Sequence, residues 1–226
     1  EITQLSELAG QRVGVPSLAS GALSFARGLL RTAGVDPETV EFLPIGVGAQ
    51  ALAAIDGGEV VAFSVFSGSI AAMELLGREF RSFTAPIAGA GMVMADSFVR
   101  DNHDLAVSIF RGFAMNQQIM LRDPEATVRA FWAAYGEPSG DPETELNNGA
   151  HFIRRTSSVF QTLDDPRLWG HYTAEEWETI KEFFGGPEGA IPADAELSTF
   201  YSDVLVEEGN QIDQSLIEDA IARFSG

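Results

Sequence analysis

The sequence contains no cysteine at any of its 226 positions. Disulfides, thiolate nucleophiles and cysteine-ligated metal sites are therefore excluded for this chain. Because cysteine-free proteins occur in oxidising and in reducing compartments, the absence does not choose between them. Long apolar runs are absent as well, since none approaches the roughly 18–20 residues that cross a bilayer.

Positive charge is scarce: lysine occurs once, at Lys181, and the formal net charge is −19. Nucleic acids and anionic membrane surfaces bind basic patches, so this charge argues against both as partners. Histidine occurs only at His103, His151 and His171, and no pair has the spacing of a metal site. We interpret the histidines as surface or capping residues, and the sequence predicts neither a bound metal nor a cofactor.

Catalytic motifs are missing too. The sequence has no G-x-S-x-G elbow and no G-x-x-x-x-G-K-[ST] phosphate loop. The stretch GVGAQA at 46–51 lacks the third glycine of a dinucleotide-binding G-x-G-x-x-G motif. The many acidic residues fall on helix patterns that predict solvated faces. We therefore predict that the chain is not an enzyme.

Residues 10–95 alternate between strand-like and helix-like patterns. Apolar residues recur with helical period in three stretches that end in glycine, 21–34, 49–58 and 67–77. Short apolar stretches predict strands at 12–16, 40–46, 60–66 and 79–86. Strands that alternate with single helices predict an α/β lobe, with a parallel sheet and helices on both faces.

A glycine-rich segment at 87–96 marks a change, and from Asp104 onward the pattern is almost purely helical. The predicted helices lie near 104–121, 124–135, 141–155, 173–184 and 213–224, with 185–212 mostly loop. The large apolar faces of this helical block need a sheet to cover them. The sequence offers no second sheet, which leaves the block incomplete by itself.

Three of the predicted strands end in turns that lead directly into helices, PSLASG, IGVGAQ and FSVFSG. Open parallel sheets bind ligands at this edge, where helix N-termini offer free N–H donors. Glycine admits a ligand close to the backbone, and serine donates and accepts hydrogen bonds. The predicted ligand-binding residues are Ser17, Ser20, Gly21, Gly46, Gly48, Ser64, Phe66 and Ser67.

A purely structural interpretation of these residues stays open. Ser20 and Ser67 suit helix N-caps, which stabilise by about 1 kcal/mol each, and the glycines suit turns. The argument for a ligand is that three such turns share one edge of the sheet.

Five stretches carry a resemblance to a known family: LSELAGQRVGVPSLASGA, LLRTAGVDPETVEFLPIGVGAQALAAIDGGEVVAFSVFSG, LGREFRSF, DPEATVRAFWAAYGE and YTAEEWETIKEFF. In their order and spacing, they resemble ABC-transporter substrate-binding proteins of the nitrate/sulfonate/taurine/thiamine-precursor family. The resemblance implies a type II periplasmic-binding-protein fold with two α/β lobes and a ligand between them. It covers nearly the whole chain.

Within that family, residues 1–90 correspond to the ligand-binding second lobe. Residues 91–226 return across a hinge near 84–95 and form a mainly helical segment that packs on the first lobe. The resemblance further implies that the opening part of the first lobe, with its own sheet, is not included in this sequence, which would account for the helical block without a sheet. Phe66 and Ser67 fall where relatives often have Trp-Asp, so the acid that would partner a ligand amine is absent.

The function implied by the resemblance is capture of a small organic solute or anion for a membrane permease and ATPase. A sulfonate, nitrate, an aminopyrimidine or an aromatic acid fits this description. The protein is expected to act as a periplasmic or extracytoplasmic monomer, although no signal peptide is visible in a chain that starts at Glu1. An enzyme of cofactor biosynthesis on the same fold and a ligand-sensing domain stay open as alternatives. The absence of cysteine speaks against the first.

Overall fold

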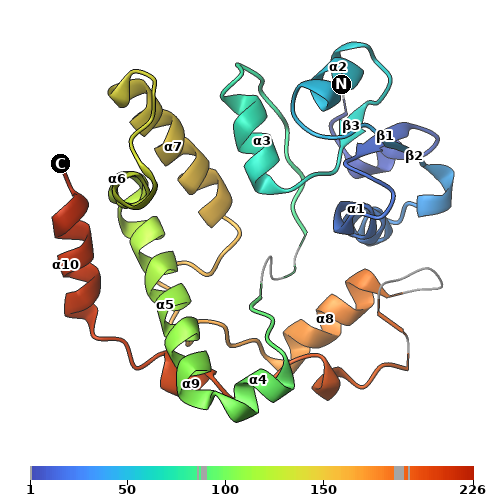
Figure 1. The fold of residues 1–226 in the computed structure, drawn as a ribbon. Helices are drawn as coiled ribbons and strands as arrows, with labels where there is room; N and C mark the ends of the chain where they lie inside the picture. Colours follow the sequence, from blue (N-terminus) through green and yellow to red (C-terminus); the bar gives the residue numbers. More distant parts are fainter. Residues whose placement is uncertain (1, 86, 88–90, 186–190, 193) are drawn as a thin grey trace. The chain divides into compact units, whose positions relative to one another are not determined.

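In the computed structural model, three short strands pair side by side in one parallel sheet. The strands are β1 (Arg12–Val15), β2 (Glu41–Pro44) and β3 (Ala62–Phe63), and their order across the sheet is β2-β1-β3 (Figure 1). Val15 pairs with Pro44, and Gly14 pairs with Phe63. The predicted α/β class with a parallel sheet is therefore confirmed.

The structure describes residues 2–85, 87, 91–185, 191–192 and 194–226, and the chain divides into two units. Unit 1 comprises Glu1–Ile87 and Thr173–Leu197, and unit 2 comprises Ala88–Tyr172 and Ser198–Gly226. The expected boundary near residue 90 lies close to the first division. Thr173–Leu197, expected in the second segment, belongs to unit 1. The predicted hinge at 84–95 includes residues 86 and 88–90, which lie outside the described residues.

The described part of unit 1 contains the sheet and four α-helices. They are α1 (Gly21–Thr32), α2 (Ala49–Asp56), α3 (Ser67–Glu74) and α8 (Ala174–Phe184), with 3₁₀ turns at Leu5–Leu8 and Pro37–Thr39. Side chains alternate between the faces of a strand, so Val13 packs with Leu30 of α1 on one face. Leu43 packs on the other face in the cluster that contains Ala51 of α2. Helices therefore cover both faces, as predicted.

Gly14 of β1 lies directly against Ile45 and Phe63, two members of the second of these clusters. A Cβ atom at this position would overlap the side chain of Ile45 and lie 3.2 Å from Cδ2 of Phe63. Glycine is therefore required here for packing of the sheet rather than for a turn.

Helix α8 joins unit 1 through a second glycine, Gly28 of α1. A Cβ atom on Gly28 would lie 2.6 Å from the carbonyl oxygen of Phe183. Arg31 donates a hydrogen bond of 2.8 Å to that same oxygen. The rings of Phe25 and Phe183 lie 5.4 Å apart between centroids. The small residue on α1 thus creates the surface on which α8 packs.

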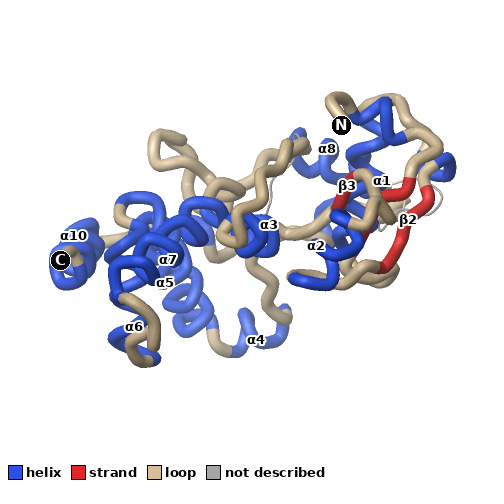
Figure 2. Tube along the Cα trace, turned by 90° about the horizontal axis from the view of Figure 1, so that it is seen from above, coloured by secondary structure: helices blue, strands red, loops and turns tan. Residues whose placement is uncertain are grey.

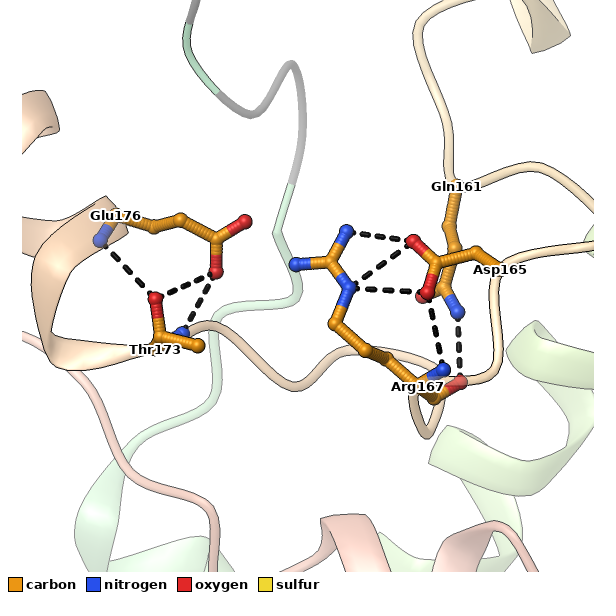
Figure 3. A network of polar contacts seen from close by, with 5 residues as sticks. All are labelled: Gln161, Asp165, Arg167, Thr173 and Glu176. Atoms are coloured by element: carbon orange, nitrogen blue, oxygen red, sulfur yellow. Dashed lines mark hydrogen bonds and ion pairs between the residues drawn. The ribbon is translucent and has the colours of Figure 1, made fainter.

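Helix α8 begins with a capping box formed by Thr173 and Glu176 (Figure 3). The Thr173 hydroxyl accepts from the N–H of Glu176 at 3.2 Å, and the Glu176 carboxylate accepts from the N–H of Thr173 at 2.7 Å. The reciprocal bonds satisfy two N–H groups that the helix itself leaves free.

The predicted strand at 79–86 is wrong. Residues 79–85 form no strand, and residue 86 lies outside the described residues. Phe80 and Phe83, the half-buried aromatic residues of the segment, are three positions apart. Residues on one face of a strand are separated by two positions, so these two side chains do not share a face.

The described residues of unit 2 form helices joined by loops, and none of them lies in a strand (Figure 2). Its helices are α4 (Asp96–Asp101), α5 (His103–Arg122), α6 (Pro124–Tyr135), α7 (Pro142–Ser157), α9 (Val206–Gly209) and α10 (Gln214–Phe224), and a 3₁₀ turn at Leu197–Thr199 crosses into the unit. The long helices confirm the predictions for this half of the chain. Helix α4 was not expected, because the helical pattern of this half of the sequence begins only at Asp104. Among the described residues, no helix is both long and apolar enough to cross a membrane.

In unit 2, histidine and arginine side chains contact carboxylates of the same unit. His103 lies 3.2 Å from Glu208, and His171 lies 3.1 Å from Asp203. Arg167 donates to both carboxylate oxygens of Asp165, and these bonds hold the pKa of Asp165 below its ordinary value (Figure 3). No group of three or more histidine and acidic side chains in the described part of the chain is placed to hold a metal ion.

Asp141 makes the stability of α7 depend on pH. Its carboxylate accepts from the hydroxyl and the N–H of Thr144, at 2.7 and 2.9 Å, and these bonds lower the pKa of Asp141. Folding therefore favours the charged form. The stabilisation is complete above the unfolded-state pKa of about 3.9 and is lost as the pH falls through the lower folded-state pKa.

We accordingly expect Asp141→Ala to lower the melting temperature by a constant amount above about pH 5 and by less below about pH 4. Circular dichroism melts of the wild type and the variant at a series of pH values measure this difference. Asp141→Asn is the control, because asparagine caps helices without titrating. A difference that stays constant down to about pH 3 contradicts the prediction.

Candidate functional site

The candidate site is the edge of the sheet in unit 1 at which all three strands end. Because the strands are parallel, the turns that follow Val15, Pro44 and Phe63 all leave from this edge. Strand β1 is central, so its turn lies between the other two. Each turn leads into a helix, α1, α2 or α3. The sequence prediction of three neighbouring turns agrees with this topology.

Two of the four predicted serines hold the protein's own backbone. The Ser20 hydroxyl accepts from the N–H of Ala22 at 3.1 Å and caps α1. The Ser64 hydroxyl donates to the carbonyl of Ala22 at 2.8 Å, and so ties the end of β3 to the first turn of α1. Ser64 has donated its single proton and offers a ligand only lone pairs, whereas Ser20 keeps its proton free to donate.

The other two serines, Ser17 and Ser67, differ from this pair. Neither hydroxyl has a hydrogen-bond partner among the described residues. Ser17 is exposed in the turn after β1, and Ser67 is half-buried at the first position of α3. Both hydroxyls are therefore available to donate to and accept from a molecule outside the chain.

The predicted glycines at this edge differ in their backbone conformation and in the space around them. Gly46 and Gly48 have φ angles of +70° and +61°, which other residues rarely adopt. The side chain of Gln50 lies over Gly46, with Oε1 2.5 Å from where a Cβ atom would be. A Cβ atom on Gly21 would have no neighbour within 4 Å, and the backbone of Gly21 is not left-handed. The turn after β2 thus depends on glycine, and Gly21 leaves open space.

The three helix N-termini differ in capping. Ser20 caps α1, but no side chain of a described residue caps α2 or α3. The turns 16–21, 45–50 and 64–69 contain no charged residue. Within these turns, the sources of positive potential are therefore the N–H groups and helix dipoles, which favour an anion or a polar acceptor.

Sequence reasoning missed two apolar side chains at this edge. Leu18 is 56% exposed and Val47 is 53% exposed, beside the predicted Phe66 at 63%. An isolated leucine or valine in a turn carries no periodic pattern, so only its exposure in the structure distinguishes it from a core residue. Gln50 was also missed, because its position over Gly46 depends on the fold of the turn.

We expect Ser64→Ala to lower the free energy of unfolding by about 1 kcal/mol, because the hydrogen bond to Ala22 is lost. Urea unfolding followed by circular dichroism measures the change. Ser17→Ala is the matched control and is expected to leave stability unchanged, because its hydroxyl has no partner among the described residues. Equal losses in the two variants contradict this assignment of structural and available hydroxyls.

Comparison with known proteins gives two findings. A family model described as NMT1/THI5 like matches residues 1–134. A solved structure from Bordetella bronchiseptica RB50 aligns with 100% of the chain, at a TM-score of 0.50 and 15% sequence identity, over 68% of its own length. At this identity, the likeness concerns the fold alone. No curated protein matches the sequence.

Proposed function

Because the chain belongs to the NMT1/THI5-like family, whose model matches more than half of its 226 residues, we propose that it is a solute-binding component of an ABC import system. The resemblance predicted from the sequence is thereby confirmed at the level of the family. On this proposal the chain binds a small organic solute or anion and passes it, chemically unchanged, to a membrane permease with its ATPase. It acts as a monomer, in the periplasm or another extracytoplasmic space.

The observation that carries the proposal is the set of uncharged turns at one edge of the sheet. These turns carry two helix N-termini that no described side chain caps, and the hydroxyls of Ser17 and Ser67, which have no partner among the described residues. Such groups bind a solute by hydrogen bonds and release it. The turns contain no histidine, acid or lysine that would act as a general acid or base. This composition favours binding over the alternative of an enzyme on the same fold.

A thermal-shift screen tests the proposal. The compounds are nitrate, a series of alkanesulfonates, aminopyrimidines and aromatic carboxylates. A ligand at about 100 times its dissociation constant stabilises the folded state by about 2.7 kcal/mol, which raises the melting temperature by roughly 5–10 °C. Mass spectrometry of the compound after incubation is expected to find it unchanged. A chemically altered compound would support the enzyme, and no stabilisation by any compound would contradict solute binding.

The double variant Ser17→Ala/Ser67→Ala tests the location. We expect the affinity of a ligand found in the screen to fall about tenfold, because two hydrogen bonds are lost. Ser6→Ala is the control, since Ser6 is an exposed residue in the 3₁₀ turn that precedes β1 and lies toward the opposite end of the strand. Equal affinity of the double variant and the wild type would place the solute elsewhere.

A further inference from the structure

The most exposed large apolar side chains of the three turns occupy equivalent positions. Leu18, Val47 and Phe66, here called the apolar triad, each stand three residues after the last residue of their strand. Their exposed fractions are 56%, 53% and 63%. Single exposed apolar residues are ordinary on protein surfaces. Three at the same position of three adjacent turns form a set that the fold places together.

The register of the sheet brings the triad to one end of unit 1. Val15 and Pro44 are paired across the sheet, and Leu18 and Val47 each follow their member of this pair by three residues. On the other side of β1, Phe63 pairs with Gly14 rather than with Val15. Phe66 is therefore one residue less advanced along the strand direction than Leu18 and Val47. Neighbouring strands are about 4.8 Å apart, which is the scale of an aromatic ring or a short alkyl chain.

The same turns hold polar groups suited to only one end of a solute. The open N–H groups of α2 and α3 and the hydroxyls of Ser17 and Ser67 bind acceptor atoms. No acidic side chain in these turns would bind an ammonium group. An inorganic anion would use the polar groups and leave the apolar triad in contact with water.

We infer that the edge selects a solute with two parts, an apolar body that covers the apolar triad and a single acceptor-rich end without an ammonium group. This inference rests on the proposed function and narrows its solute class. An arenesulfonate, a longer alkanesulfonate or an aromatic carboxylate fits it. Nitrate, a taurine-like zwitterion and short alkanesulfonates do not.

Matched pairs of probes, measured by isothermal titration calorimetry, test the inference. Each pair shares a head group and differs in its body: methanesulfonate with benzenesulfonate, and acetate with benzoate. We expect the aromatic member of a pair to bind the wild type at least tenfold more tightly, since it buries additional apolar area. Equal affinities within both pairs would contradict a role of the apolar triad in binding, but would not contradict solute binding itself.

Variants locate the effect. Leu18→Ser and Val47→Ser are each expected to weaken benzenesulfonate about tenfold and to change methanesulfonate by less than about twofold. Leu76→Ser is the control, because Leu76 is 64% exposed but follows the far end of α3. Circular dichroism melts confirm that the variants fold. Unchanged affinity for benzenesulfonate in both triad variants would overturn the inference.

The calorimetry distinguishes failure of the proposed function from failure of this inference. If no member of either pair, and no compound of the thermal-shift screen, binds the wild type, the proposed function is contradicted, and the inference fails with it. If the probes bind but the short and the aromatic members are equivalent, only the inference fails.

Discussion

Gly28→Ala is expected to lower the free energy of unfolding by about 3 kcal/mol. Alanine is the better helix former by about 1 kcal/mol, so local propensity alone predicts the opposite sign. The new methyl group would lie 2.6 Å from the carbonyl oxygen of Phe183 and 2.6 Å from the nearest carbon of its ring. Backbone does not yield to such a contact as a flexible side chain does, so α8 must move away and lose the hydrogen bond from Arg31.

Urea unfolding followed by circular dichroism measures this loss. Trp177 lies in α8, so its fluorescence in a Trp132→Phe/Trp169→Phe background reports on the helix itself. Gly21→Ala is the matched control in the same helix, because no atom lies within 4 Å of the added carbon. It is expected to leave stability unchanged or to raise it by up to about 1 kcal/mol. Similar effects of both variants would show that the packing of α8 on Gly28 contributes little.

Ser67→Asp has the second large effect, on binding rather than on folding. Ser67 begins α3, whose N-terminus no side chain of a described residue caps. A carboxylate about 5 Å from a bound anion opposes it by about 3 kcal/mol at an effective dielectric constant near 20, which weakens binding about 100-fold. The same carboxylate interacts favourably with the helix dipole, so the stability of α3 is expected to be maintained or raised.

Calorimetry with benzenesulfonate measures the change, and benzylamine serves as the oppositely charged probe. Ser67→Asn is the control, because it is close to aspartate in size, carries no charge and is expected to change benzenesulfonate affinity by less than about threefold. Ser67→Asp is expected to improve binding of benzylamine, in line with the Trp-Asp pair that the family resemblance implies at this position. A loss for benzenesulfonate no larger than that in Ser67→Asn would exclude the N-terminus of α3 from the charged end of the site.

The fold of unit 1 follows from the sequence where its signals are local. The helix over 21–34 is observed as α1 at Gly21–Thr32, because its apolar residues recur with helical period and Ser20 and Gly34 mark its ends. The strand expected over 60–66 is reduced to Ala62–Phe63 in the structure. The length of a strand depends on how many residues its neighbour pairs with, and apolar composition does not contain that information.

Contacts between distant residues set the limit of the sequence prediction. Arg31 and Phe183 are 152 positions apart, and their contact places α8 in unit 1 rather than with the other helices. The pattern of α8 gives its helical period and its cap, but any apolar surface satisfies such a pattern. The surface on which α8 packs is determined by Gly28, because only glycine leaves room there for Phe183. In the apolar pattern of α1, this glycine only interrupts the periodicity.

By itself, the sequence determined the α/β class, the order of strands and helices in unit 1, the capped helix starts and the edge at which to look for a ligand. Each of these depends on residues that are close along the chain. Only the tertiary structure separated Ser64, whose hydroxyl is bonded to a residue 42 positions away, from Ser17 and Ser67, whose hydroxyls are available. Only the tertiary structure showed that the side chains of Leu18 and Val47 are exposed rather than part of the core. A hydroxyl's partner and a side chain's exposure are set by which segments meet in space, and that is decided when the whole chain packs.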